Sequence, residues 1–154
     1  MTPGPALQNW LRAEGFPEDD INATLDNATT PLMRAALKGD VEIAKAILAD
    51  GGKIEARNGD GNNALWLACV EKHLAMIDLL IEAGIDFDNG NENGATALMF
   101  AASSGRTEVV ERLLAHGAEI HAETPDGFTA LDMAANIDCL KLLRAAHKKS
   151  PARV

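Results

Sequence analysis

Thr96-Ala97-Leu98 is one of four short copies that decide the fold of this chain of 154 residues. The others are Thr30-Pro31-Leu32, Asn63-Ala64-Leu65 and Thr129-Ala130-Leu131, and the four copies begin at a constant interval. A glycine series keeps the same interval, at Gly61, Gly94 and Gly127. A fixed period of this length predicts a stacked repeat protein, in which each unit buries its apolar face against its neighbours.

The repeat between Ala95 and Gly127 predicts two helices and a hairpin. Thr96 is expected to cap a short first helix that ends near Ser104-Gly105. The second helix is expected from about Thr107 to His116, and Gly117 ends it because glycine takes the left-handed conformation without steric cost. Residues 118–127 then read as a short extended hairpin with a turn.

Each first helix also carries a leucine and a pair of small residues. The pairs are Ala35-Ala36, Ala68-Cys69, Ala101-Ala102 and Ala134-Ala135. We expect the small residues to let neighbouring first helices approach closely, because larger side chains would overpack the stack. The leucines at 32, 65, 98 and 131 are expected to fill the space between units.

These motifs resemble the ankyrin repeat, whose signature is T-P-L-H-x-A in a unit of about 33 residues. Thr30-Pro31-Leu32-Met33-Arg34-Ala35 matches the signature except at the histidine, and Gly105-Arg106-Thr107-Glu108-Val109-Val110 is similar to the family's start of the second helix. Gly117-Ala118-Glu119-Ile120-His121-Ala122 is similar to its G-A-D-V-N-A ending. The resemblance implies an all-α ankyrin-repeat solenoid of stacked helix-turn-helix units with short β-hairpin loops.

The predicted organisation is a single ankyrin-repeat domain over residues 1–154 with modified ends. Residues 1–28 resemble the second half of a repeat and are expected to form an N-terminal cap. Three repeats are expected at 29–61, 62–94 and 95–127. Residues 128–154 form a C-terminal capping repeat and basic tail, because three residues are missing between its two helices.

Charge and cysteine content restrict the partners and the compartment. Residues 1–140 carry a net charge of −14 and residues 141–154 one of +5, which together give −9. An acidic body disfavours nucleic acid and anionic membranes, and no signal peptide or membrane span is expected. Cys69 and Cys139 are far apart and suit a reducing compartment, so we expect a cytoplasmic protein.

No catalytic, cofactor or metal site is predicted, and the chain is not expected to be an enzyme. A Cys69–His73 dyad is disfavoured because a turn separates the two residues. His116 and His121 lack further metal ligands. Asn58-Gly59-Asp60-Gly61 begins like a calcium loop but lacks the closing glutamate, so turn chemistry explains it better.

The remaining candidate site is the outer surface, and the resemblance implies partner binding through hairpin tips and the exposed side of the first helices. The predicted partner-binding residues are Arg57, Asn58, Asp60, Trp66, Asn91, Glu92, Ser103, Glu123, Asp126 and Phe128. Trp66 and Phe128 are the candidate aromatic anchors, although Trp66 could equally pack against its neighbours. The acidic tips favour a partner with Lys or Arg.

The sequence therefore predicts a non-enzymatic protein–protein interaction module. A small regulatory subunit of an enzyme encoded nearby is the alternative, and an enzyme or metal carrier is the less favoured one. The sequence leaves both a monomer and a weak dimer open.

Overall fold

The computed structural model describes residues 3–149, which fall into two compact units. The first unit is Met1–Ile85 and the second is Asp86–Val154. Their boundary lies after the second helix of the repeat predicted at 62–94. Each unit is described by itself.

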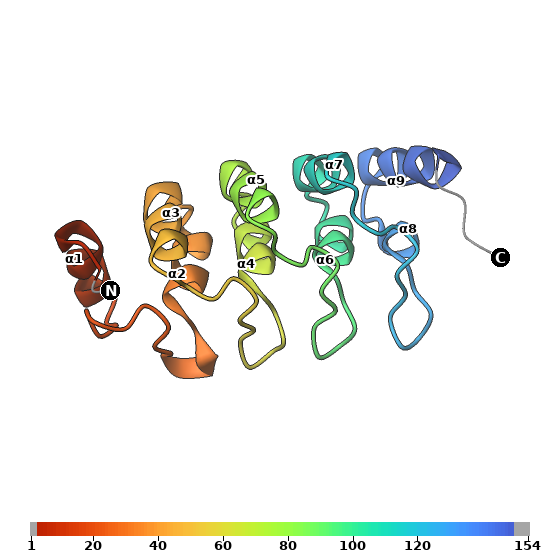
Figure 1. Ribbon diagram of the computed structural model, residues 1–154. Coiled ribbons are helices and arrows are strands. Elements are labelled where there is room, and N and C mark those ends of the chain that lie inside the picture. The colour runs from red at the N-terminus through yellow and green to blue at the C-terminus, as the bar shows by residue number, and fades with distance from the viewer. Residues whose placement is uncertain (1–2, 150–154) are drawn as a thin grey trace. The chain divides into compact units, whose positions relative to one another are not determined.

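The first unit contains one isolated helix followed by two helix pairs (Figure 1). Its elements are α1 (Pro5–Ala13), the 3₁₀-helix η1 (Asp26–Ala28), α2 (Pro31–Lys38), α3 (Val41–Ala49), α4 (Ala64–Val70) and α5 (Leu74–Glu82). Helix α2 packs against α3 and α4, and α4 packs against α5. The predicted stacking of helix pairs is therefore confirmed within this unit.

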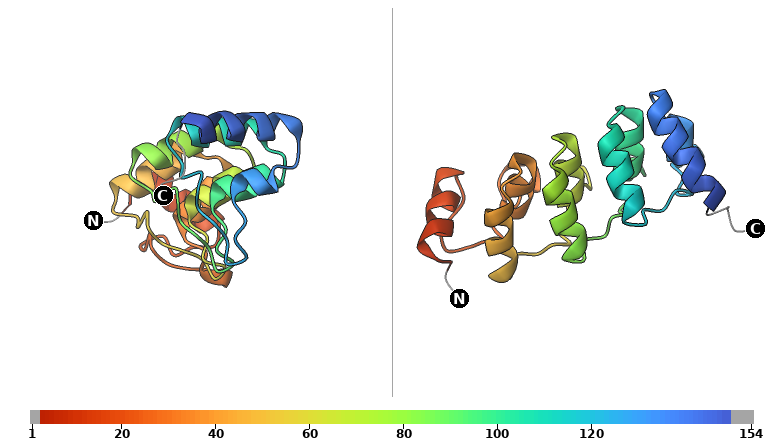
Figure 2. Two further views of the ribbon diagram at one scale, coloured as in Figure 1. Left: turned by 90° about the vertical axis from the view of Figure 1, so that its right-hand side faces the viewer. Right: turned by 90° about the horizontal axis from the view of Figure 1, so that it is seen from above.

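The second unit contains two further helix pairs. They are α6 (Ala97–Ser103) with α7 (Thr107–Ala115), and α8 (Ala130–Met133) with α9 (Ile137–Lys149). Helix α6 packs against α8 and α7 against α9. Figure 2 shows α9 beside α7, and α9 is the longer helix, with 13 residues against 9.

The repeated motif begins each first helix by a local hydrogen bond. The side-chain oxygens of Thr30, Asn63, Thr96 and Thr129 each accept a bond from the backbone N–H three residues later. This bond satisfies one of the helix-terminal amides that have no partner within the helix. The predicted cap at Thr96 is confirmed by the 3.3 Å bond from the Met99 N–H.

One turn position shows why glycine recurs between the two helices of a pair. Gly39 and Gly105 have φ values of 74° and 69°, in the left-handed region. Lys72 stands at the same position of the intervening copy with φ 59°. A side chain in this region costs about 1–2 kcal/mol, so the second copy carries local strain.

His73 follows this turn and joins two repeats of the first unit. Its Nε2–H donates to the Leu37 carbonyl oxygen at 2.9 Å, at the end of α2. The ring also fills the space beside Gly39, where an added Cβ would lie 2.4 Å from Nδ1. Position 39 therefore needs glycine for two reasons: the imidazole leaves no space for a Cβ, and the backbone is left-handed.

The core of both units follows the predicted leucine and alanine positions. Leu32, Leu65 and Leu98 are almost completely buried, as are the small pairs of the first three copies. The last copy differs, because Leu131 and Ala134 are half-buried and Ala135 is exposed. Its first helix, α8, is also short, with 4 residues. The expected filling of the space between units is therefore incomplete at Leu131, and the expectation that Ala134 and Ala135 belong to the first helix is wrong, because α8 ends at Met133.

The N-terminal cap is attached by charged and aromatic contacts. Glu14 accepts hydrogen bonds from Lys38 at 2.6 Å and from Arg34 at 3.2 Å. These bonds, the Lys38 bond foremost, hold the pKa of Glu14 below its ordinary value despite some desolvation. Trp10 stacks on Phe16, and the Arg34 guanidinium lies over the Phe16 ring.

The hairpin loops are held by a few backbone hydrogen bonds rather than by paired strands. Among residues 3–149 no strand forms, and one isolated antiparallel bridge joins Leu25 to Thr29. At the corresponding positions each later loop is closed by a backbone bond from Asn58, Asn91 or Thr124 to the carbonyl four residues on, and a second bond returns from the glycine three residues on to the carbonyl of the same residue. These short hairpins carry most of the predicted site.

Candidate interaction surface

In the first unit, Asn58 organises the predicted tip. Its side-chain oxygen accepts the backbone N–H groups of Asp60 at 3.0 Å and Asn62 at 3.1 Å. Arg57 donates from Nε to the Gly61 carbonyl at 3.0 Å. Asn58 is thus a turn-forming residue, as Asn side chains commonly are when they bond the backbone two residues on.

The second unit repeats this arrangement. Asn91 accepts the N–H groups of Asn93 and Ala95, both at 3.0 Å. The Thr124 hydroxyl accepts the Phe128 N–H at 3.2 Å in the last hairpin. Asn91, like Asn58, therefore fixes the conformation of the loop that carries the exposed tip residues. Sequence reasoning placed both asparagines among the contacts. It attributed residues 58–61 to turn chemistry but gave Asn91 no such role, although its equivalent place in the next copy signals it.

Neighbouring loops of the first unit are also joined. The Asn27 side-chain amide donates to the Asp60 carboxylate at 3.1 Å, and the Gly59 N–H donates to the Asn27 carbonyl at 3.0 Å. Asp60 is consequently tied to the preceding loop while remaining exposed. The first-unit tip is held at a fixed distance from the loop before it.

The predicted contact residues divide by exposure and by unit. Arg57, Asp60, Glu92, Ser103, Glu123, Asp126 and Phe128 are exposed, whereas Asn58, Trp66 and Asn91 are half-buried. Phe128 exposes 52% of its surface. Arg57, Asn58, Asp60 and Trp66 belong to the first unit and the other six to the second. Trp66 lies in α4, and its backbone N–H donates to the Asn63 side-chain oxygen. Its half-buried side chain fits both packing against neighbours and contact with a partner.

A bond from a backbone N–H to a side chain joins adjacent repeats in each unit. Asn22 accepts the Lys53 N–H at 2.9 Å, and Asp88 accepts the Glu119 N–H at 2.8 Å. Desolvation raises the pKa of Asp88, and the negative charges of Asp86 and Glu119 add to this effect against the opposing hydrogen bond. The amide in the first unit makes the same bond without a charge.

The cysteines and histidines that catalysis or metal binding could use do not converge in a common site. Cys69 and Cys139 are both completely buried. His73 directs Nε2 to Leu37 rather than to a thiol, so the structure does not form the dyad. His121 meets His147 edge to face at 4.9 Å. No group of three potential metal ligands occurs within residues 3–149.

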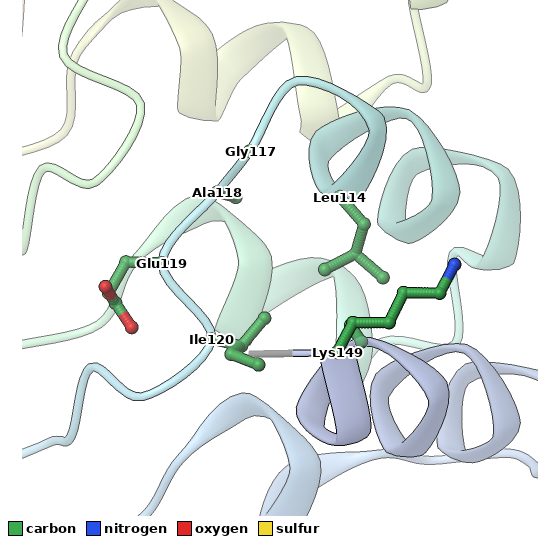
Figure 3. Close-up of a pocket in the computed structure, with 7 residues that line it drawn as sticks. Leu114, Gly117, Ala118, Glu119, Ile120 and Lys149 are labelled. Atoms are coloured by element: carbon green, nitrogen blue, oxygen red, sulfur yellow. The ribbon is translucent and has the colours of Figure 1, made fainter. Parts of the chain in front are cut away.

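Two open hollows of about 270 and 290 Å³ adjoin the C-terminal half of α9. They share Leu114, Ala146 and Lys149, and Figure 3 shows Glu119 and Ile120 at the wall of the first. The second hollow is lined mostly by apolar surface, and the first is lined about equally by polar and apolar surface. Sequence reasoning missed these hollows; the greater length of the last helix was the available signal.

The chain matches one known family along almost its whole length. Within the described part, no helix combines the length and apolar character that crossing a membrane requires. The family model described as ankyrin repeats (3 copies) matches residues 5–91 and again residues 86–152. We found no match among curated proteins. Together with the capped helix pairs that recur at a constant interval, the two family matches show that this chain belongs to the ankyrin repeat family.

Proposed function

We propose that this chain is a non-enzymatic protein-interaction module whose hairpin tips bind a partner bearing Lys or Arg. Ankyrin repeats generally mediate protein–protein interaction. The observation that carries the proposal is the exposed acidic character of the second-unit tips. Glu92 in one hairpin and Glu123 and Asp126 in the next are exposed, and neither hairpin contains a cation.

The rigidity of the loops supports this surface. Asn91 and Thr124 bond the backbone of their own hairpins, so the tips are ordered before a partner arrives. A pre-ordered loop loses less conformational entropy on binding than a flexible one. Exposed Phe128 adds an aromatic side chain beside the acidic tip, which is the residue type that dominates interface energies.

The test begins with capture of a partner from the native cell extract and continues with the purified pair. We expect the double variant Glu92→Gln with Glu123→Gln to lower the affinity for the partner and to make that affinity less dependent on salt, because complementary charges contribute to association. Phe128→Ser is expected to cost about 1 kcal/mol or more of binding free energy, the scale of an anchor truncation. Titration calorimetry at low and high salt measures both effects.

A matched pair elsewhere in the second unit provides the control. Glu108→Gln with Glu111→Gln removes the same charge from exposed positions of α7. This pair should leave the affinity nearly unchanged. Equal losses from both pairs would show a general charge effect, and no loss from the tip pair would remove the tips from the binding site.

We further propose that the module acts in the cytoplasm. Both cysteines are free and completely buried, which suits a reducing compartment. Imaging of a tagged chain in its own cells tests this location, and a periplasmic, secreted or organellar signal would contradict it.

A further inference from the structure

A helix face that is covered in the repeat at 95–127 is open in the last repeat. Leu98 and Ala102 of α6 expose 1% and 0% of their surfaces, and α8 packs against this helix. One repeat later, Leu131 of α8 is half-buried. Ala135, the sequence counterpart of Ala102, lies beyond the end of α8, and its N–H bonds back to the Ala102 carbonyl at 2.9 Å. The face of α6 that receives a helix therefore continues on α8 at Leu131, with no helix against it in the described part of the second unit (Figure 1).

The second helix of the repeat shows the same pattern. Thr107 begins α7, and its hydroxyl meets the Asn136 amide at 3.4 Å and the Cys139 sulfur at 3.6 Å. This first helical position thus faces the following repeat. Ile137 occupies it in α9 and exposes 63% of its surface. An apolar side chain is therefore largely exposed at the position that, one repeat earlier, contacts the following repeat.

A cationic stripe borders this surface on α9. Lys141, Arg144 and Lys148 are exposed and spaced three and four residues apart, so they share one side of the helix. Cys139 and Leu143, on the opposite side, are buried towards the stack. We call Leu131 and Ile137 together with these three cations the end face.

We propose that the end face binds an amphipathic helix of a partner protein, with carboxylates flanking its apolar side. The apolar side of that helix would pack on Leu131 and Ile137, as the apolar face of an amphipathic helix does when it docks on a protein. The carboxylates would pair with Lys141, Arg144 and Lys148. This surface goes beyond the acidic tips and selects the opposite charge.

Two other occupants fit the charges less well. A symmetric pair of copies joined through this face would place the cationic stripe against itself, which is repulsive. Nucleic acid and anionic membranes are extended polyanions, and a chain with net charge −9 repels them at long range. A short acidic helix avoids the first cost and, because it carries fewer charges than a polyanion, reduces the second.

The probes are two fluorescent synthetic peptides of about 16 residues, long enough to form a stabilised helix. They share an Ala/Leu face and differ in flanks of Glu or Lys. We expect the intact protein to bind the Glu peptide in anisotropy titrations and to bind the Lys peptide at least about tenfold more weakly. Lys141→Glu with Lys148→Glu should reverse this preference.

The matched charge control is Lys53→Glu with Lys72→Glu, two exposed cations of the first unit. It should leave the preference for the Glu peptide intact. Ile137→Ser should weaken the Glu peptide about tenfold or more, the effect of losing an interface anchor. Circular dichroism checks that each variant remains folded.

Equal binding of the two peptides, or no binding of either, would overturn the proposal. The proposal would also be overturned if the protein bound phosphatidylserine vesicles or single-stranded RNA and lost that binding in the variant Lys141→Glu with Lys148→Glu. Self-association in sedimentation that is lost in Ile137→Ser would assign the face to a second copy instead. The tip variants Glu92→Gln and Glu123→Gln should not affect peptide binding, so failure of one surface is distinguishable from failure of the other.

Discussion

Replacing Gly39 by alanine tests whether His73 acts as a staple between two repeats. The backbone at Gly39 has φ 74°, where a Cβ costs about 1–2 kcal/mol. That Cβ would also lie 2.4 Å from His73 Nδ1 and 2.6 Å from Cε1. The ring must move, which breaks its 2.9 Å bond to Leu37 and costs about 0.5–1.5 kcal/mol more. We expect a total destabilisation of about 1.5–3.5 kcal/mol.

Gly51 supplies the control in the same unit. It has φ 93°, and nothing lies within 4 Å of an added Cβ. Gly51→Ala should therefore show only the backbone cost of about 1–2 kcal/mol. The difference between the two variants isolates the displaced histidine.

Urea unfolding followed by tryptophan fluorescence measures these changes, because Trp10 and Trp66 are the chain's only tryptophans and both lie in the first unit. In a His73→Ala background, the Gly39→Ala cost should fall to that of Gly51→Ala, a non-additivity expected of residues in contact. Equal costs for Gly39→Ala and Gly51→Ala in the native background would refute the staple. Additive losses in the double variant would refute it as well.

Three further predictions concern single positions. Lys72→Gly should raise the unfolding free energy by about 1 kcal/mol by relieving its left-handed strain, and urea unfolding that shows no gain would contradict this. Leu98→Ala should cost about 2–5 kcal/mol in thermal or urea unfolding, whereas half-buried Leu131→Ala should cost clearly less. The raised pKa of Asp88 makes stability fall as pH rises from the ordinary carboxyl value of 3.8 through the raised value, because the folded state holds the proton more tightly. Asp88→Asn keeps an acceptor for the Glu119 N–H, so unfolding midpoints from pH 3 to 8 should lose this decline.

Local signals made the helices predictable. The second helix of the third repeat was expected from Thr107 to His116 and ends at Ala115. Caps and left-handed glycines act over a few residues, so their positions can be read from the chain. For the last helix the sequence predicts residues 138–147 approximately, and in the structure it extends over Ile137–Lys149. Its longer C-terminal end has no glycine to stop it within the described residues.

Contacts between repeats were the part that sequence reasoning could not supply. Nothing near His73 in the sequence indicates that its ring fills the space beside Gly39, because that contact depends on how two helix pairs stack. The raised pKa of Asp88 likewise depends on burial and on Glu119, 31 residues away. The predicted contact residues remain a prediction, and Asn58 and Asn91 show that a tip residue can also serve the loop itself.

The distribution of the two thiols makes each unit separately measurable. Cys69 lies in the first unit and Cys139 in the second, and both are completely buried. Alkylation by iodoacetamide must therefore await an opening of the surrounding helices. Mass spectrometry of the two modified peptides over time would give two protection factors from one sample, one for each half of the molecule.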